Sequence, residues 1–341
     1  MSATTQVSKM SRQEKLSAIR NKNQEVIKQI TMADFEEGGR LNRQQFATFY
    51  QQVFETADVL DMVRSVPVDG PESQIDKIGL DRYILQPVGE AEDVDATTIN
   101  DGKIDIDVTE AGFGYELSRR TVEDTIEREN TAEIILDMHS ERFGTDLEHL
   151  AFRGDETYEN VDEPTYESFL SQNDGWLVKA EEEGANTSDH ASTIDNDVFF
   201  DAIYGVEDRF LRATDPVFFG HPKQLTAYRQ YLTERETPLG DESVVDRGMP
   251  TPSGYPFVPT TAMPPDQIMF TDPNNLLYTP HREMFVDVTT EGKDVVFKRL
   301  FAIYAMSARF DFVVEEGSAV SIIKDIAVPT GVEEHPHQDD L

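Results

Sequence analysis

The hydrophobic positions in the first sixty residues repeat at helical spacing. Ser11 and Glu14 form a capping-box pattern ahead of a narrow apolar stripe, which predicts a helix over about residues 12 to 30. After a Gly-Gly pair, a second apolar stripe predicts another helix. Its apolar positions are Phe46, Phe49, Tyr50, Val53, Ala57 and Leu60. Two amphipathic helices ahead of any strand predict an N-terminal arm.

The period then changes from helical to alternating. Lys103–Val108 alternates between charged and apolar side chains, which predicts a strand, and we expect Ile78–Leu85 to pair with it. The loop between them is rich in Asp and Glu, so the pattern predicts a long hairpin with an acidic tip. A proline-free helical pattern follows over residues 118 to 152, with Gly144 as the point where it can bend or break. A continuous helix of this length would measure roughly 52 Å.

The second half of the chain mixes helices with short strands. Residues 153 to 195 are acidic and rich in loops around Trp176, the only tryptophan, which we expect to be a packing anchor. Helices are predicted over Asp195–Leu211 and from His221 to Leu232, on either side of a buried strand, Pro216–Gly220. Short strands such as Ile268–Phe270 follow in a proline-rich stretch. A β-rich region over 285–328 and a flexible tail complete the chain.

Charge is the feature of the composition that changes this picture most. The 341 residues include 66 Asp and Glu against 30 Lys and Arg, which gives a net charge of −36. Such a chain is a poor simple nucleic-acid binder, and its surface is typical of proteins kept soluble in high salt. An ordinary acidic protein from a low-salt organism is the alternative interpretation.

Residues 1 to 30 depart from this acidic trend. Six basic side chains stand there against Glu14 and Glu25, for a net charge of +4. The basic residues are Lys9, Arg12, Lys15, Arg20, Lys22 and Lys28. The segment either faces DNA or a scaffold, or pairs with an acidic neighbouring subunit, and we favour the second interpretation.

Sequence motifs for catalysis are missing. The chain has no cysteine, no phosphate-binding glycine motif and no nucleophile elbow. Asp146 with His149, and the run Glu181–Glu183, are better explained as solvated side chains than as metal ligands. No apolar run is long enough to span a membrane. We therefore expect no enzyme activity, no cofactor, no metal and no membrane partner.

Several stretches, in this order, carry a resemblance to a known family. They are residues 57–68 with Lys77–Gly79, residues 116–122 leading through the long helix to His149–Asp155, Tyr278–Glu283 and Ala308–Glu315. The ordered set resembles the major capsid protein of tailed viruses over roughly residues 40 to 328, and is nearest to the P-two-like phage branch. Together with the acidic composition, it suggests a haloarchaeal tailed virus.

The resemblance implies an α+β fold, that of phage Hong Kong ninety-seven. Its parts would be an N-arm (1–60), an extended β-hairpin loop (66–115), a long spine helix (118–152), a peripheral domain (153–195 and 280–328), an axial domain (196–279) and a flexible tail (329–341). A covalent Lys–Asn crosslink would use Lys77 or Lys103, and we do not expect one.

The resemblance also implies a structural function. The chain would self-assemble into hexamers and pentamers of an icosahedral virion capsid, formed in the host cytoplasm. The shell would hold double-stranded DNA without sequence-specific binding, with portal and possible decoration proteins and a separate scaffold as partners. Arms and hairpins cannot bury their apolar sides alone, so the candidate subunit contacts are Phe46, Phe49, Val53, Ile104, Ile106 and Val108.

Two other functions stay open from the sequence. A nanocompartment shell uses the same fold to enclose protein cargo. An acid-pair hydrolase of a halophile would instead need one buried carboxylate with a raised pKa.

Overall fold

The structure of the chain is a computed structural model. It describes residues 57, 59–68, 70, 72–79, 100–118, 131–160, 164–213, 215–234, 252–281, 285–289 and 292–328. The chain divides into two compact units. The first includes residues 110–148 and 283–308, and the second includes residues 62–109, 149–282 and 309 onward. The predicted first arm helix, Phe46, Phe49, Val53, the six basic N-terminal residues and the tail all lie outside the described residues.

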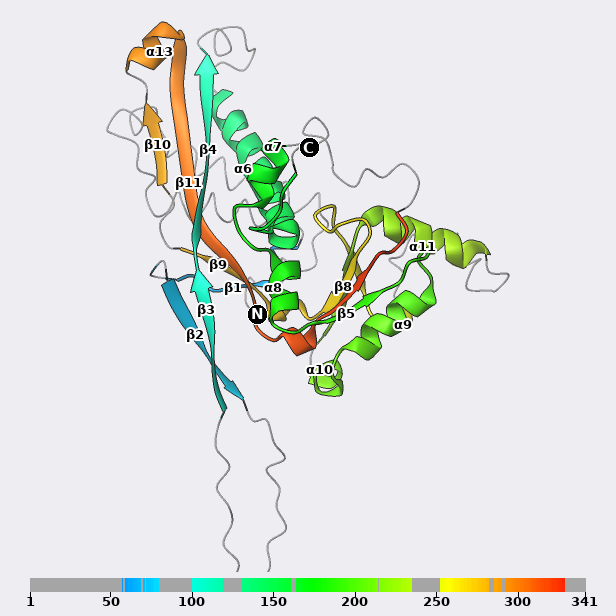
Figure 1. Cartoon of the computed structure of the whole chain (residues 1–341). Coiled ribbons are helices and arrows are strands. Elements are labelled where there is room, and N and C mark those ends of the chain that lie inside the picture. Colours follow the sequence, from blue (N-terminus) through cyan, green and yellow to red (C-terminus); the bar gives the residue numbers. More distant parts are fainter. Residues whose placement is uncertain are drawn as a thin grey trace, which may run out of the picture. The chain divides into compact units, whose positions relative to one another are not determined.

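The first unit is built on long paired strands. Its elements are β4 (Thr109–Ser118), the first part of α6 (Thr131–Arg153), β10 (Phe285–Thr289), α13 (Lys293–Phe297) and the first part of β11 (Leu300–Val314). Strand β11 pairs with both β10 and β4, and α13 joins β10 to β11 at one end of these strands (Figure 1). A Cβ at Gly112 of β4 would lie 2.9 Å from the Met306 carbonyl oxygen, so this close strand approach requires glycine.

The long helix differs from its predicted bounds at one end. Ser118, where the helix was expected to begin, is the last residue of β4, a strand that pairs with β11; nearby, the Tyr115 ring stacks on Tyr304 with ring centroids 4.5 Å apart. The described helix begins at Thr131 and runs through Gly144 to Arg153, one residue beyond the predicted end. Gly154 follows it, and a Cβ there would lie 2.2 Å from a neighbouring backbone oxygen.

The second unit contains a five-stranded mixed sheet with helices on both faces. In spatial order the strands are β5 (Asn186–Asp189), β12 (Ser321–Lys324), β8 (Ile268–Thr271), β6 (Val217–Gly220) and β7 (Phe257–Pro259). Helices α9 (Asn196–Gly205) and α11 (Pro222–Glu234) cover one face (Figure 1), where Phe199 and Tyr228 pack with Phe218. On the other face Phe219 contacts Phe152 at the end of α6, with ring centroids 5.8 Å apart.

Several predictions for this sheet are confirmed and one is wrong. Strands β6 and β8 and helix α11 match the predicted segments. The single helix expected over Asp195–Leu211 is two helices, α9 and α10 (Asp208–Ala213). The break follows Gly205, where a Cβ would come within 2.4 Å of side-chain atoms of Asn186 and Ser321.

The remaining elements of the second unit include a two-stranded hairpin, β2 with β3, and two strands, β1 and β9, that join the sheet of β11. They are β1 (Arg64–Ser65), β2 (Glu72–Gly79), β3 (Asn100–Asp107), α7 (Pro164–Leu170), α8 (Trp176–Glu182), η1 (Pro252–Gly254), η2 (Pro273–Asn275), β9 (Leu276–Pro280) and η3 (Gly317–Ala319). Strand β9 pairs with β1 and with the last part of β11.

The hairpin formed by β2 and β3 is present, but its register is not the predicted one. Ile104 lies opposite Ile75, and Lys103 opposite Asp76, so the partner strand begins six residues before Ile78. The predicted pairing of Lys103–Val108 with Ile78–Leu85 is therefore wrong: Ile78 and Gly79 pair instead with Asp101 and Asn100, and residues 80–85 lie outside the described residues. The observed register puts Ile75 beside Ile104 on the side that packs against the body of the unit.

Candidate functional site

The apolar face of the hairpin is used within its own unit. Ile106 is 2% exposed, and Ile104 and Val108 are partly buried against the same cluster. The buried members of the cluster are Val68, Ile106, Leu277 and Val313. Its own chain covers Ile106 to this extent, and the contact of Ile106 with a neighbouring subunit stays a prediction. Ile104 and Val108 stay predicted contacts.

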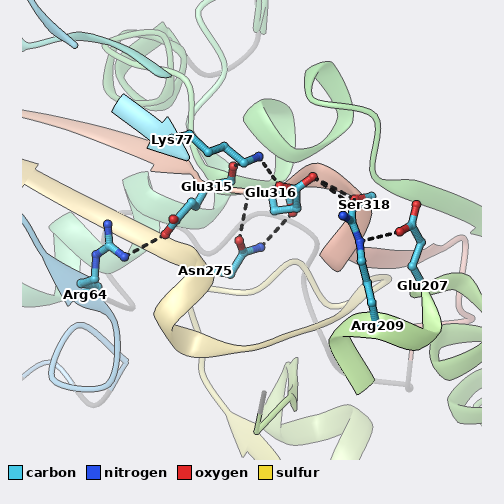
Figure 2. A network of polar contacts seen from close by, with 8 residues as sticks. All are labelled: Arg64, Lys77, Glu207, Arg209, Asn275, Glu315, Glu316 and Ser318. Carbon is cyan, nitrogen blue, oxygen red and sulfur yellow. Dashed lines mark hydrogen bonds and ion pairs between the residues drawn. The ribbon is translucent and has the colours of Figure 1, made fainter. Parts of the chain in front are cut away.

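A polar network joins this hairpin to the rest of the unit (Figure 2). We call it the Glu316 network, after the carboxylate that receives most of its contacts. Its members come from β1, β2, α10 and the residue before it, η2, the turn after β11, and η3. They are Arg64, Lys77, Glu207, Arg209, Asn275, Glu315, Glu316 and Ser318.

Glu316 binds cationic groups from two separate elements. Its Oε2 forms an ion pair with the Lys77 ammonium of β2, and its Oε1 lies 3.5 Å from Nη2 of Arg209 on α10. The Ser318 hydroxyl also donates to Oε1, at 3.0 Å. Burial acts to raise the pKa of the Glu316 carboxyl, but Lys77, Ser318 and Arg209 together outweigh it, so this pKa lies below its usual value. The carboxylate is thus held in its charged form.

Backbone hydrogen bonds fix the turn that carries Glu316. The Asn275 side chain accepts from the Glu316 N–H at 2.9 Å and donates to the Glu316 carbonyl oxygen at 3.0 Å. Lys77 Nζ also donates to the carbonyl oxygen of Glu315, at 3.0 Å, while the Glu315 side chain pairs with Arg64 at 2.8 Å. Lys77 therefore ties β2 to this turn through two acceptors at once.

Asp311 ties the other strand of the hairpin to the same unit. This β11 residue is 3% exposed, and its Oδ2 accepts from the backbone N–H of Asp107 at the end of β3, at 3.0 Å. Its Oδ1 accepts from the N–H of Phe312 at 2.8 Å and from the Asn173 amide at 3.4 Å. Burial raises the pKa of Asp311 to about 6, although these donors and the charge of Lys179 act to lower it.

Asp311 does not form the site of an acid-pair hydrolase. It is the buried carboxylate with a raised pKa that such an enzyme would need, yet both of its oxygens accept from N–H groups of the core and its side chain is closed to solvent. Among the described residues, no group of three or more His, Asp or Glu is placed to hold a metal ion. Asp146 forms an ion pair with Arg142 at 2.9 Å.

We expect Glu316→Gln to loosen strand β2. The amide cannot pair with Lys77 or Arg209 as a charge, so amide hydrogens of β2 should exchange roughly fivefold faster, which corresponds to about 1 kcal/mol. Hydrogen–deuterium exchange with mass spectrometry on the full chain measures this. The matched control is Glu315→Gln, which removes the pair with Arg64 but keeps the backbone acceptor for Lys77. Equal exchange of β2 in the wild type and Glu316→Gln would show that the network does not hold the hairpin.

Exposed apolar side chains mark other surfaces of the described chain. On α9, Phe200 is 42% exposed and Tyr204 81% exposed, one turn apart on the side away from the core. On α13, Val296 is 67% exposed and Phe297 83% exposed. No helix of the part that the structure describes is long and apolar enough to cross a bilayer.

Sequence reasoning missed the Glu316 network and Asp311. The network joins residues far apart in the sequence, and no local pattern marks them. Asp311 did carry a signal, because it is a lone charge inside the apolar run from Phe310 to Val314. A charge within a strand that is apolar on both faces indicates a buried, hydrogen-bonded carboxylate.

Comparison with known proteins places this fold. No protein-family model matches the chain. The prophage capsid protein YqbE of Bacillus subtilis (strain 168) is 26% identical over 320 residues, which cover 89% of this chain and 98% of that protein. A chain of the satellite phage P4 procapsid, a structure that includes the size determination (Sid) protein, has a TM-score of 0.64 and 16% identity, and the match covers 83% of this chain and 91% of that one.

Two further structures widen the comparison. A subunit of the capsid of a native GTA particle has a TM-score of 0.57 and 18% identity, and the match covers 80% of this chain and 91% of that one. The SrpI encapsulin of Synechococcus elongatus has a TM-score of 0.50 and 13% identity, over 82% and 90% of the two chains. The chain therefore has the α+β fold of tailed-phage capsid proteins, as the sequence predicts.

Proposed function

We propose that this chain is a structural capsid protein, which self-assembles into the hexamers and pentamers of an icosahedral shell around double-stranded DNA. The observation that carries the proposal is its similarity, over nearly the whole length of both chains, to a prophage capsid protein. The capsid fold supports it independently. Shell proteins act by burying interfaces rather than by turnover, so this function needs no catalytic residues.

The finer assignment is part of the same proposal. The order of elements favours the P-two-like branch, with an N-arm (1–60), an extended loop (66–115), a spine, a peripheral domain and an axial domain. The net charge of −36 favours a haloarchaeal host. Scaffold, portal and decoration proteins would be the other partners, and assembly would take place in the host cytoplasm before packaging.

The N-terminal arm is proposed to contact a neighbouring subunit. Its six basic residues would meet an acidic surface, since the rest of the chain carries a net charge of −40. Phe46, Phe49 and Val53, together with the partly exposed Ile104 and Val108, would supply apolar contacts. A DNA-facing or scaffold-facing arm is the competing hypothesis.

A nanocompartment shell is the second candidate function, and the similarity to an encapsulin favours it. The contents of the shell separate the two. Electron microscopy at molar salt should show icosahedral shells or capsomer rings, and virions should contain this chain around double-stranded DNA. Shells filled with protein and free of nucleic acid would support the nanocompartment, whereas a monomer at high concentration, with scaffold supplied, would contradict both functions.

We expect the shells to lose integrity when diluted into low salt. The Debye length grows from about 3 Å at 1 M salt to about 10 Å at 0.1 M, so copies that each carry −36 repel one another over longer distances. Light scattering and microscopy after stepwise dialysis measure this, with osmolarity held constant by sucrose as the control. Shells unchanged down to 0.1 M salt would contradict the high-salt interpretation.

A further inference from the structure

The short helix α13 presents an exposed apolar and basic surface. Val296 and Phe297 are 67% and 83% exposed, and the side chains of Lys293, Lys298 and Arg299 around them are also exposed. We call these five residues the α13 knob. It lies where the chain turns from β10 into β11, at the end of the paired strands (Figure 1).

Buried neighbours hold the knob in place. Val295 is 1% exposed and Leu300 is 5% exposed, so the residues before and after the exposed pair are anchored in the first unit. The Val296 N–H donates to the Gly292 carbonyl oxygen at 3.1 Å, and Lys298 forms an ion pair with Glu116 of β4. The exposed Phe and Val are thus presented from a fixed turn, which lowers the entropy cost of contact with another surface.

The charge of the knob is opposite to that of the chain. Residues 293–299 contain Lys293, Lys298 and Arg299 against Asp294, a net charge of +2, so the other 334 residues carry −38. Three cationic side chains within seven residues contrast with 30 in the whole chain. The surface that an extra copy of this chain offers is therefore mostly of the complementary sign.

We propose that the α13 knob docks on an acidic surface of a second copy of this chain, with Val296 and Phe297 at the centre of the contact and Lys293 and Arg299 at its rim. This inference rests on the proposed shell function and names one contact within it. The contact joins different surfaces on the two copies, so it is a heterologous contact. Contacts of this kind build a closed ring when the rotation from each copy to the next adds up to a full turn. An apolar centre with a charged rim is the usual anatomy of a protein interface.

Nucleic acid is a less suitable occupant of the knob. Lys293 and Arg299 could form ion pairs with phosphates, but the net charge of −38 on the rest of the chain repels a polyanion. A phosphate backbone would also leave the apolar side chains of Val296 and Phe297 without an apolar partner. A second copy of the chain can offer acidic side chains to Lys293 and Arg299 and apolar surface to Val296 and Phe297.

A photo-crosslinker in place of Phe297 tests the identity of the occupant. Full-length chain with p-benzoylphenylalanine at position 297 is made in ¹⁴N and ¹⁵N forms, mixed, assembled at molar salt and irradiated. We expect mixed-isotope crosslinked peptides in which position 297 is joined to a segment rich in Asp and Glu. Crosslinks only within one isotope form, or only to DNA or another protein, would overturn the proposal.

Matched variants test the energetics of the same contact. Phe297→Ser should raise the protein concentration needed for assembly about tenfold, as expected for an interface hot spot, and Lys293→Glu should act in the same direction. Phe297→Leu and Lys293→Arg keep the apolar and charged groups and should assemble as the wild type does. If the wild type assembles and Phe297→Ser assembles at the same protein concentration, the knob contact is overturned but the shell function is not. Failure of the wild type to assemble overturns both.

Discussion

Replacing Trp176 with alanine should lower the free energy of unfolding of the second unit by about 4 kcal/mol. The indole is 0% exposed and packs edge-on against Phe152 and Phe312, at centroid distances of 5.2 and 5.5 Å. Its Nε1–H also donates to the Leu277 carbonyl oxygen of β9, at 3.0 Å. The substitution therefore opens a cavity between α6, α8 and β11 and removes a buried donor.

Urea titration followed by circular dichroism at molar salt measures this effect. Fluorescence is unsuitable for the comparison because Trp176 is the only tryptophan, and guanidinium would change the ionic strength. Trp176→Phe is the matched control: it keeps most of the apolar volume, loses the donor, and should cost about 1 to 2 kcal/mol. A loss below about 1 kcal/mol for Trp176→Ala would mean that this aromatic contact is not part of the cooperative core.

The elements predicted correctly are those whose pattern is local. Strand β6 is a short apolar run between Pro216 and His221, and α11 begins at Pro222, a residue suited to the first helical turn. Trp176 is confirmed as a packing anchor, since its ring faces other aromatic rings and its N–H a backbone oxygen. For the strand and the helix, the chain neighbours of the element carry enough information.

The predictions that failed depended on tertiary partners. The helical pattern across Gly205 gives no sign that Asn186 and Ser321 approach the backbone there. Either strand register of the hairpin places isoleucines on one face, and only packing against Val68 and Leu277 selects the pairing of Ile75 with Ile104.

The Glu316 network could not be predicted from the sequence for a related reason. A glutamate after a strand, in a chain with 66 acidic residues, has nothing to distinguish it from a solvated one. Its role follows only from the fold, which brings both Lys77 and Arg209 to Glu316, although these two residues are 132 positions apart in the chain (209 minus 77). Charge composition predicts how the surface responds to salt, whereas specific ion pairs require the fold.

Asp311 should make the stability of the second unit fall as the pH rises from about 4 to about 6. Burial raises the pKa of this carboxyl to about 6 in the folded chain, whereas the unfolded chain has the ordinary value of 3.8. Between these values the folded state binds more protons than the unfolded state, so the stabilising protonated form is lost as the pH rises through 6. The difference corresponds to about 3 kcal/mol.

The variant Asp311→Asn isolates this contribution from the background of other carboxylates. The amide has nearly the same size and does not titrate. The stability of the wild type relative to the variant should therefore fall by about 2 kcal/mol between pH 4 and pH 6, out of about 3 kcal/mol in total, and stay nearly constant above pH 7. Loss of the hydrogen bond from the Asp107 N–H adds an offset that does not depend on pH. Urea titrations at fixed molar salt across this range give the difference. A constant difference from pH 4 to pH 7 would show that the hydrogen bonds to Asp311 fully offset its burial, and a difference that rises with pH would show that the carboxylate stabilises the hairpin in its charged form.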